Sequence, residues 1–145
     1  MNAAYLWAQL QAADQINDNR LATWQAYYDA FAPFSEAGRI ELPYVPDGCV
    51  HNAHMFYLKC RDLADRTAFI DYMKAAGVQC SFHYVPLHSA PAGLRFGRFA
   101  GEDVYTTAES DCLVRLPMYS ELDPADLQKV IATAKEFFES DEAAV

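Results

Sequence analysis

The sequence predicts an α+β fold in which a long N-terminal helix precedes a small antiparallel three-stranded sheet covered by helices. Apolar residues recur at helical spacing over residues 3–32 and again over residues 124–138. Between these segments, apolar and polar residues alternate in short runs, which is typical of strands. The chain has 145 residues, close to the commonest domain size, so we expect a single domain over residues 1–145.

The first helix is expected over residues 3–32, with Pro33 and the region of Gly38 ending it. Its apolar stripe weakens at Asn17 and Arg20, where polar residues take apolar positions. A helix of about thirty residues is roughly 45 Å long, more than the width of a domain of this size. We therefore expect part of it to pack outside the chain, as in self-association. The side chains expected to remain partly uncovered are Trp7, Leu10, Trp24 and Tyr27.

Strands are expected over residues 39–42, 54–60 and 78–84, because apolar side chains alternate with polar ones there. A helix over residues 65–76 separates the last two, and Gly77 is placed to end it. These segments make up the three-stranded sheet and one of its covering helices.

Residues 86–105 form a long irregular loop, which in compact domains is usually functional. The spacing from Thr106 to Glu109 is that of a capping box and predicts a helix ending near Arg115. The last helix is expected to start with Asp123 as its N-cap and Pro124 in its first turn. An acidic tail over residues 140–145 is expected to fray.

The charge balance excludes several functions. Acidic residues outnumber basic ones by 20 to 11, for a net charge of −9, so a phosphate-backbone binder or an anionic-membrane binder is not expected. Residues 1–30 mix polar side chains into every window and contain no signal-peptide core. The four cysteines have no short spacing, and we expect reduced thiols in a cytoplasmic protein with no nucleic-acid or membrane partner.

Two types of catalytic site are weakly indicated. The first is a zinc site built from the four histidines, because neutral imidazoles are good zinc ligands. However, the sequence has no H-E-x-x-H motif and no carboxylate at ligand spacing from these histidines. A Cys–His nucleophile would use Cys80 and His83, which alternation places on opposite faces of a strand. The histidines are His51, His54, His83 and His88.

In two stretches the chain turns at a proline just after a predicted strand or helix and carries side chains that could bind a ligand. Residues 82–88 carry two histidines and a tyrosine out of a strand, and residues 115–119 carry an arginine past a predicted helix end. From the residues alone, ordinary strand and helix ends explain them equally well.

Four stretches taken together resemble the DegT/DnrJ-type sugar-nucleotide aminotransferases. They match the C-terminal portion of that family in order and spacing across essentially the whole chain. The stretches are Ala3–Leu10, His54–Tyr57, His83–His88 and Arg115–Pro117. The resemblance implies the small C-terminal domain of the aspartate-aminotransferase fold, with residues 1–35 as an interdomain helix and 39–139 as the α+β body.

The resemblance also implies an activity. Family members are usually homodimers that use pyridoxal phosphate to move an amino group, typically from glutamate, onto a nucleotide-linked keto sugar. Here this implies a 4-keto-6-deoxy sugar used for surface polysaccharide. The residues it implies for substrate binding are His83, Tyr84, His88 and Arg115, with Arg95 and Arg98 as weaker candidates.

The large domain that carries the Schiff-base lysine in this family has no counterpart in the sequence. We therefore expect the chain alone to be inactive and to bind no pyridoxal phosphate. Two other hypotheses remain open, a free-standing α+β binding domain and, more remotely, a metal-dependent hydrolase that uses the histidines.

Overall fold

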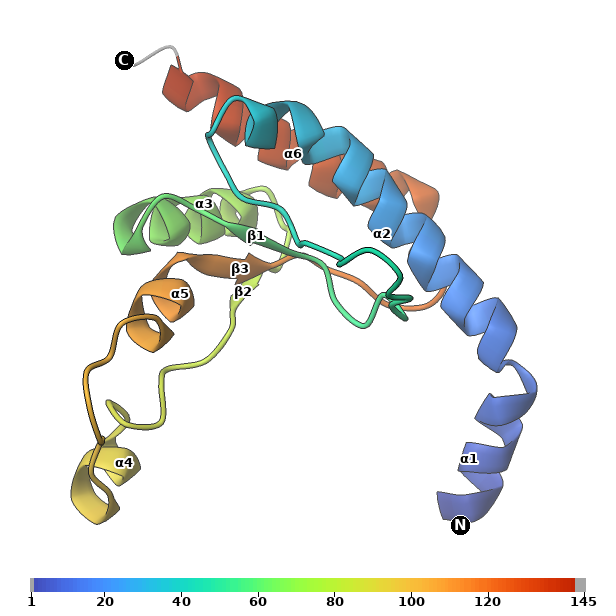
Figure 1. Cartoon of the computed structure of the whole chain (residues 1–145). Coiled ribbons are helices and arrows are strands. Elements are labelled where there is room, and N and C mark those ends of the chain that lie inside the picture. Colours follow the sequence, from blue (N-terminus) through green and yellow to red (C-terminus); the bar gives the residue numbers. More distant parts are fainter. Residues whose placement is uncertain (1, 143–145) are drawn as a thin grey trace.

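The computed structural model describes residues 2–142 and has the expected α+β architecture. The elements in chain order are α1 (Asn2–Gln11), α2 (Ala13–Glu36), β1 (Tyr57–Lys59), α3 (Leu63–Ala75), β2 (Ser81–Phe82), α4 (Pro91–Phe96), α5 (Thr106–Cys112), β3 (Leu113–Arg115) and α6 (Pro124–Glu142). Helices α2, α3 and α6 pack together on one side of a short sheet (Figure 1).

The sheet has three antiparallel strands in the order β1-β3-β2. Its central strand, β3, was expected to be the end of the helix over residues 106–115, and that prediction is wrong. Val114 is fully buried between Leu58 of β1 and Phe82 of β2, so pairing on both sides makes this segment a strand. Residues 39–42 contribute only one bridge, in which Glu41 and Lys59 exchange two backbone hydrogen bonds of 3.0 Å.

The strands are shorter than the alternating runs predict. Phe56 and Leu58 are fully buried as expected, but β1 covers only residues 57–59 of the predicted 54–60. In the predicted strand 78–84, burial ends at Cys80, while Phe82 and Tyr84 are exposed. Phe82 is the last residue of β2, where the Arg66 guanidinium lies 5.2 Å from its ring centroid, and Tyr84 lies beyond the strand. The following loop contains the short helix α4.

The N-terminal helix is broken. Ala12, with φ −108° and ψ 10°, separates α1 from α2, so the expected single helix over residues 3–32 is two helices. Pro33 does not end α2, which continues to Glu36 and ends at Gly38. There the Arg39 N–H donates to the Phe34 carbonyl at 2.8 Å, with Gly38 at φ 73°. The lost hydrogen bond at Pro33 falls in the last turn, where buried Tyr27 and Phe31 already anchor the helix.

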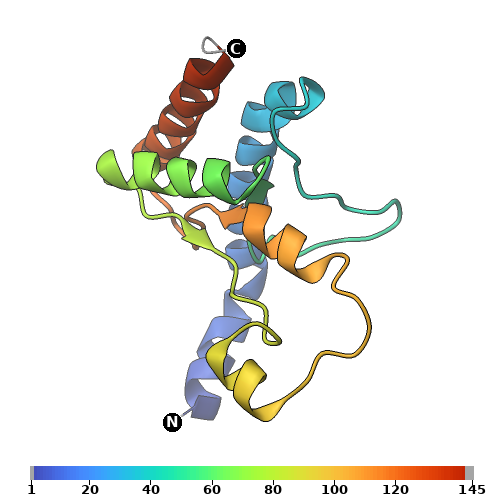
Figure 2. The ribbon, with the colours of Figure 1, turned by 90° about the vertical axis from the view of Figure 1, so that its left-hand side faces the viewer.

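Helix α1 has no buried residue. The expectation of an uncovered apolar face is confirmed for Trp7 and Leu10, which are 66% and 60% exposed. It is wrong for Trp24 and Tyr27, which are buried in the core because α2 lies against the sheet and α6. In both views α1 and α4 project on the side of the molecule away from α6 (Figure 1, Figure 2).

Aromatic rings join the three core helices to the sheet. Phe138 of α6 stacks on Phe69 of α3, with ring centroids 5.2 Å apart, and meets Phe31 of α2 edge-on at 6.3 Å. Phe56, just before β1, packs against Tyr27 at 5.2 Å. Helices from both halves of the sequence thus share one core.

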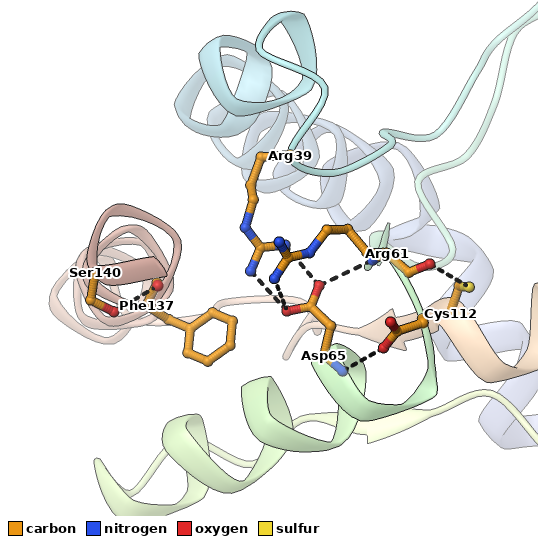
Figure 3. A network of polar contacts seen from close by, with 7 residues as sticks. Arg39, Arg61, Asp65, Cys112, Phe137 and Ser140 are labelled. Atoms are coloured by element: carbon orange, nitrogen blue, oxygen red, sulfur yellow. Dashed lines mark hydrogen bonds and ion pairs between the residues drawn. The ribbon is translucent and has the colours of Figure 1, made fainter. Parts of the chain in front are cut away.

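A buried ion pair connects the end of α2 to α3 (Figure 3). Arg39 donates two hydrogen bonds to the Asp65 carboxylate, at 2.7 and 2.8 Å, and the Arg61 backbone N–H donates a third at 3.0 Å. The Arg39 guanidinium lies 5.1 Å from the ring centroid of Phe138 and 5.7 Å from that of Phe137, both on α6. The pair therefore ties three segments together in the core.

The end of α3 and the start of α6 follow the local sequence as predicted, and the start of α5 does not. Gly77, with φ 78°, ends α3 as predicted, and Asp123 caps α6 by accepting from the Ala125 N–H at 2.7 Å. The capping box at α5 is absent, because Asp103 accepts from the Thr107 N–H and Glu109 pairs with Lys59 at 2.9 Å.

Residues 140–142 continue α6, and the fraying expected over residues 140–145 stays a prediction. Residues 143–145 lie outside the described residues. Among the described residues, no helix combines the length and the apolar character required to span a bilayer.

Candidate functional site

Helices cover one face of the sheet, and the other face is partly exposed. Because side chains alternate along a strand, Leu58 and Val114 share the face beneath the core helices. Tyr57, Ser81 and Arg115 share the other face, where Arg115 lies in register between the other two. All three are only partly buried. This face is therefore open to a ligand.

Arg115 occupies the centre of the open face and retains hydrogen-bonding capacity. Its Nη2 donates to the Phe82 carbonyl at a long 3.4 Å, and its Cζ lies 5.5 Å from the ring centroid of Tyr84. Its buried Nε has no hydrogen-bond partner among the described residues. A guanidinium held in this way is suited to an anionic group such as a phosphate or a carboxylate.

His83 and Tyr84 complete a cluster with Arg115. The two rings are 4.9 Å apart, edge to face, and the buried Nδ1 of His83 has no hydrogen-bond partner in the described part of the chain. Tyr84 is 68% exposed, while its backbone carbonyl accepts from the Ser110 hydroxyl. The structure thus brings together three of the four side chains expected to bind substrate. We call His83, Tyr84 and Arg115 the Arg115 cluster.

The fourth, His88, is engaged elsewhere. Its Nε2 lies 2.8 Å from the Asp103 carboxylate, and its ring packs on Phe99 at 4.4 Å. Asp103 also accepts from Thr107, and these hydrogen bonds, more than the nearby imidazole, hold the pKa of this carboxyl below its usual range. His88 therefore joins the two ends of the long loop. Of the weaker candidates, Arg95 lies over its neighbour Phe96, at 4.9 Å.

A pocket of about 440 Å³ adjoins the cluster and includes Arg20, which the sequence did not predict as a site residue. Arg20 of α2 donates from Nε to the Ala53 carbonyl at 3.0 Å and from Nη2 to the His54 carbonyl. The first of these carbonyls belongs to Ala53, which has a left-handed conformation with φ 48°, four residues before β1 begins. The sequence signal was the polar residue at an apolar position of the helix. The lining residues are Arg20, His54, Met55, Gln79, Ser81, Arg115, Leu116, Pro117 and Met118.

The two buried cysteines, which include the candidate Cys80, do not fit the role of a nucleophile. All four are free thiols, and burial raises the pKa of Cys60 and of Cys80 to about 12, so both stay protonated at neutral pH. Among the described residues, no three histidine, cysteine or carboxylate side chains are grouped to hold a metal ion.

Comparison with known proteins gives this geometry a context. Residues 1–135 match the sequence profile of the DegT/DnrJ/EryC1/StrS aminotransferase family. The chain belongs to this family.

Solved structures of aminotransferases share the fold. TlmJ from Streptoalloteichus hindustanus superposes with a TM-score of 0.80 at 19% identity, over 92% of this chain and 34% of that protein. DesV from S. venezuelae, solved with a ketimine intermediate, gives 0.80 at 22% identity, over 94% and 36%. Helicobacter pylori PseC, an aminotransferase of pseudoaminic acid biosynthesis, gives 0.76 at 15%, over 92% and 36%. The chain spans about a third of the length of these relatives.

Lys59 of this DegT-family chain is held in its charged form by two carboxylates. Burial lowers the pKa of Lys59, but its hydrogen bonds to Glu41 at 2.6 Å and to Glu109 outweigh this and raise the pKa well above the ordinary value. An aldimine requires a deprotonated amine. The other lysines, Lys74, Lys129 and Lys135, are on helices α3 and α6 and do not line the pocket beside Arg115.

Proposed function

We propose that this chain is the small, substrate-facing domain of a pyridoxal-phosphate-dependent sugar aminotransferase. The reaction is transfer of an amino group from an amino-acid donor, glutamate, to a nucleotide-linked 4-keto-6-deoxy sugar, for which we propose dTDP-4-oxo-6-deoxy-D-glucose. Surface-polysaccharide biosynthesis in the cytoplasm is the proposed setting. The observation that carries the proposal is the Arg115 cluster on the open face of the sheet, in which the buried Nε of Arg115 and Nδ1 of His83 have no hydrogen-bond partner among the described residues. This cluster lies in a chain that belongs to an aminotransferase family.

The Arg115 cluster supplies groups suited to such a substrate. The guanidinium of Arg115 offers paired N–H donors to a diphosphate, and the exposed Tyr84 hydroxyl can donate to or accept from a sugar hydroxyl. The unsatisfied Nδ1 of His83 adds a further polar group at the same place. In the proposal His88 contributes indirectly, because its contact with Asp103 holds the long loop in place.

In the proposed enzyme, other parts of the protein supply the cofactor site and its lysine, and a second subunit completes the dimer. The apolar side chains of α1, which are more than half exposed, support packing against another part of a homodimeric enzyme. The chain itself contributes binding and orientation of the nucleotide sugar, and no proton transfer is assigned to its residues.

The test uses the complete enzyme that contains this chain. Arg115→Met should lower kcat/KM for the nucleotide sugar by about 10-fold or more, because a hydrogen bond to a charged group contributes roughly 1.5–3 kcal/mol. Tyr84→Phe should lower it by about 2- to 10-fold, because a hydrogen bond between neutral groups contributes roughly 0.5–1.5 kcal/mol. Half-reaction kinetics with glutamate should be unchanged. Tyr105→Phe, at another exposed tyrosine, is the matched control. Wild-type kinetics in both cluster variants would show that this cluster does not bind the substrate.

A further inference from the structure

The outer edge of β2 has no partner strand. At the opposite edge of the sheet, Glu41 exchanges two backbone hydrogen bonds with Lys59 and thereby occupies the outer side of β1. β2 pairs only with β3, and no described strand lies on its other side. Upstream of this strand, the N–H groups of Gly77 and Val78 donate to the Lys74 and Met73 carbonyls of α3, so the edge available for pairing covers residues 79–82. Unpaired edges of this kind can accept an added strand.

Grooves flank this edge on both sides. A groove of about 600 Å³ lies between residues 77–82 and α3, where Ile70 and Lys74 form its wall. A second, of about 400 Å³, lies between the same residues and the start of α6, with Tyr119 and Lys129 in its wall. Side chains of an added strand point alternately to the two faces of the sheet. Successive side chains of such a strand would therefore enter the α3 groove and the α6 groove in turn.

The charges along the edge favour an acidic segment. Within the described residues, neither Lys74 nor Lys129 forms an ion pair, and the Lys129 Nζ would lie 3.5 Å from a Cβ built on Gly77. Asp126 is the one carboxylate lining either groove. Two ammonium groups against one carboxylate make the edge locally positive on a chain of net charge −9.

We propose that the edge over residues 79–82 docks an extended acidic segment of a partner protein, added to the sheet as a strand beside β2. Backbone hydrogen bonds give the pairing, apolar side chains enter the grooves, and Asp or Glu side chains meet Lys74 and Lys129. A second copy of this chain does not match, because its own residues 79–82 contain no carboxylate.

The experiment measures fluorescence anisotropy of a short labelled peptide in which Val and Glu alternate, titrated with the full chain. Lys74→Glu and Lys129→Glu should each weaken binding by about tenfold. Lys135→Glu, on α6 but outside both grooves, should leave it unchanged. Hydrogen exchange should slow within residues 79–82 when the peptide binds.

Two further probes separate strand addition from simple charge attraction. The same peptide with alternate backbone amides N-methylated keeps its carboxylates and should lose binding. A Val–Lys peptide should not bind. Equal binding of the N-methylated peptide, equal affinity for Lys74→Glu and Lys135→Glu, or protection outside residues 79–82 would each overturn the proposal. So would a dimer of the chain that protects this edge and excludes the peptide.

Discussion

Asp65→Asn should be strongly destabilising, because it removes the carboxylate from the centre of the core network. The Asp65 and Arg39 side chains are each only 6% exposed and share two hydrogen bonds of 2.7 and 2.8 Å. Asparagine keeps the shape but removes the negative charge facing a buried guanidinium. Removing one partner of a buried pair reduces stability by roughly 3–5 kcal/mol. The remaining ring contacts of Arg39 with Phe138 lead us to expect a loss of about 3 kcal/mol.

Urea unfolding of the chain at pH 7, followed by tryptophan fluorescence, measures this loss. A decrease of about 3 kcal/mol moves the midpoint down by roughly 1–2 M urea, given the usual dependence for small domains. Asp71→Asn is the matched control, since Asp71 is exposed on the same helix, α3. A difference of less than about 0.5 kcal/mol between the two variants would refute the reasoning, because surface changes commonly vary by that amount.

The same variant has a defined pH dependence. Burial raises the pKa of the Asp65 carboxyl, but hydrogen bonds from Arg39 and from the Arg61 backbone outweigh it and hold the pKa below the usual range. The stabilisation is therefore complete above the unfolded-state pKa, about 3.9, and is lost as the pH falls through the folded-state pKa. The stability difference between wild type and Asp65→Asn should be constant from pH 7 to about 5 and shrink below pH 4.

Three further predictions concern helix ends and the cofactor. Gly77→Ala should lower the free energy of unfolding by about 1 kcal/mol, since Gly77 has φ 78°, and Gly77→Asn should lose less; thermal melts compare the two. Asp123→Ala should lose about 1 kcal/mol in the same assay by removing the cap on the Ala125 N–H, whereas Asp123→Asn should retain most of it. The chain treated with pyridoxal phosphate and borohydride should show only scattered, substoichiometric adducts by mass spectrometry. One stoichiometrically modified lysine would contradict the absence of a Schiff-base amine.

The structure places three of the four predicted site residues close together, and their role in binding stays a prediction. His83 and Tyr84 leave β2 together and Arg115 lies across from Ser81, so the strand register joins stretches more than thirty residues apart. Sequence indicated these side chains only through a family resemblance. In the sequence Arg20 is only a polar residue that interrupts an apolar stripe. Its role could not be predicted, because the carbonyls of Ala53 and His54 that it contacts are brought near only by the fold.

The sequence by itself determined what depends on local chemistry. The apolar stripe of α6, its Asp123 cap and the Gly77 end of α3 follow from helical spacing, side-chain capping and glycine's access to positive φ. The α+β class follows from the same patterns.

Only the tertiary structure decided what depends on distant partners. Residues 113–115 form the central strand because β1 and β2 supply hydrogen bonds on both sides and bury Val114, and three residues are too few to carry a periodic signal. The break at Ala12 likewise leaves α1 outside the core while Trp24 and Tyr27 of α2 are buried in it. A strand or a buried face exists only when its neighbour is in place, and the neighbour here comes from elsewhere in the chain.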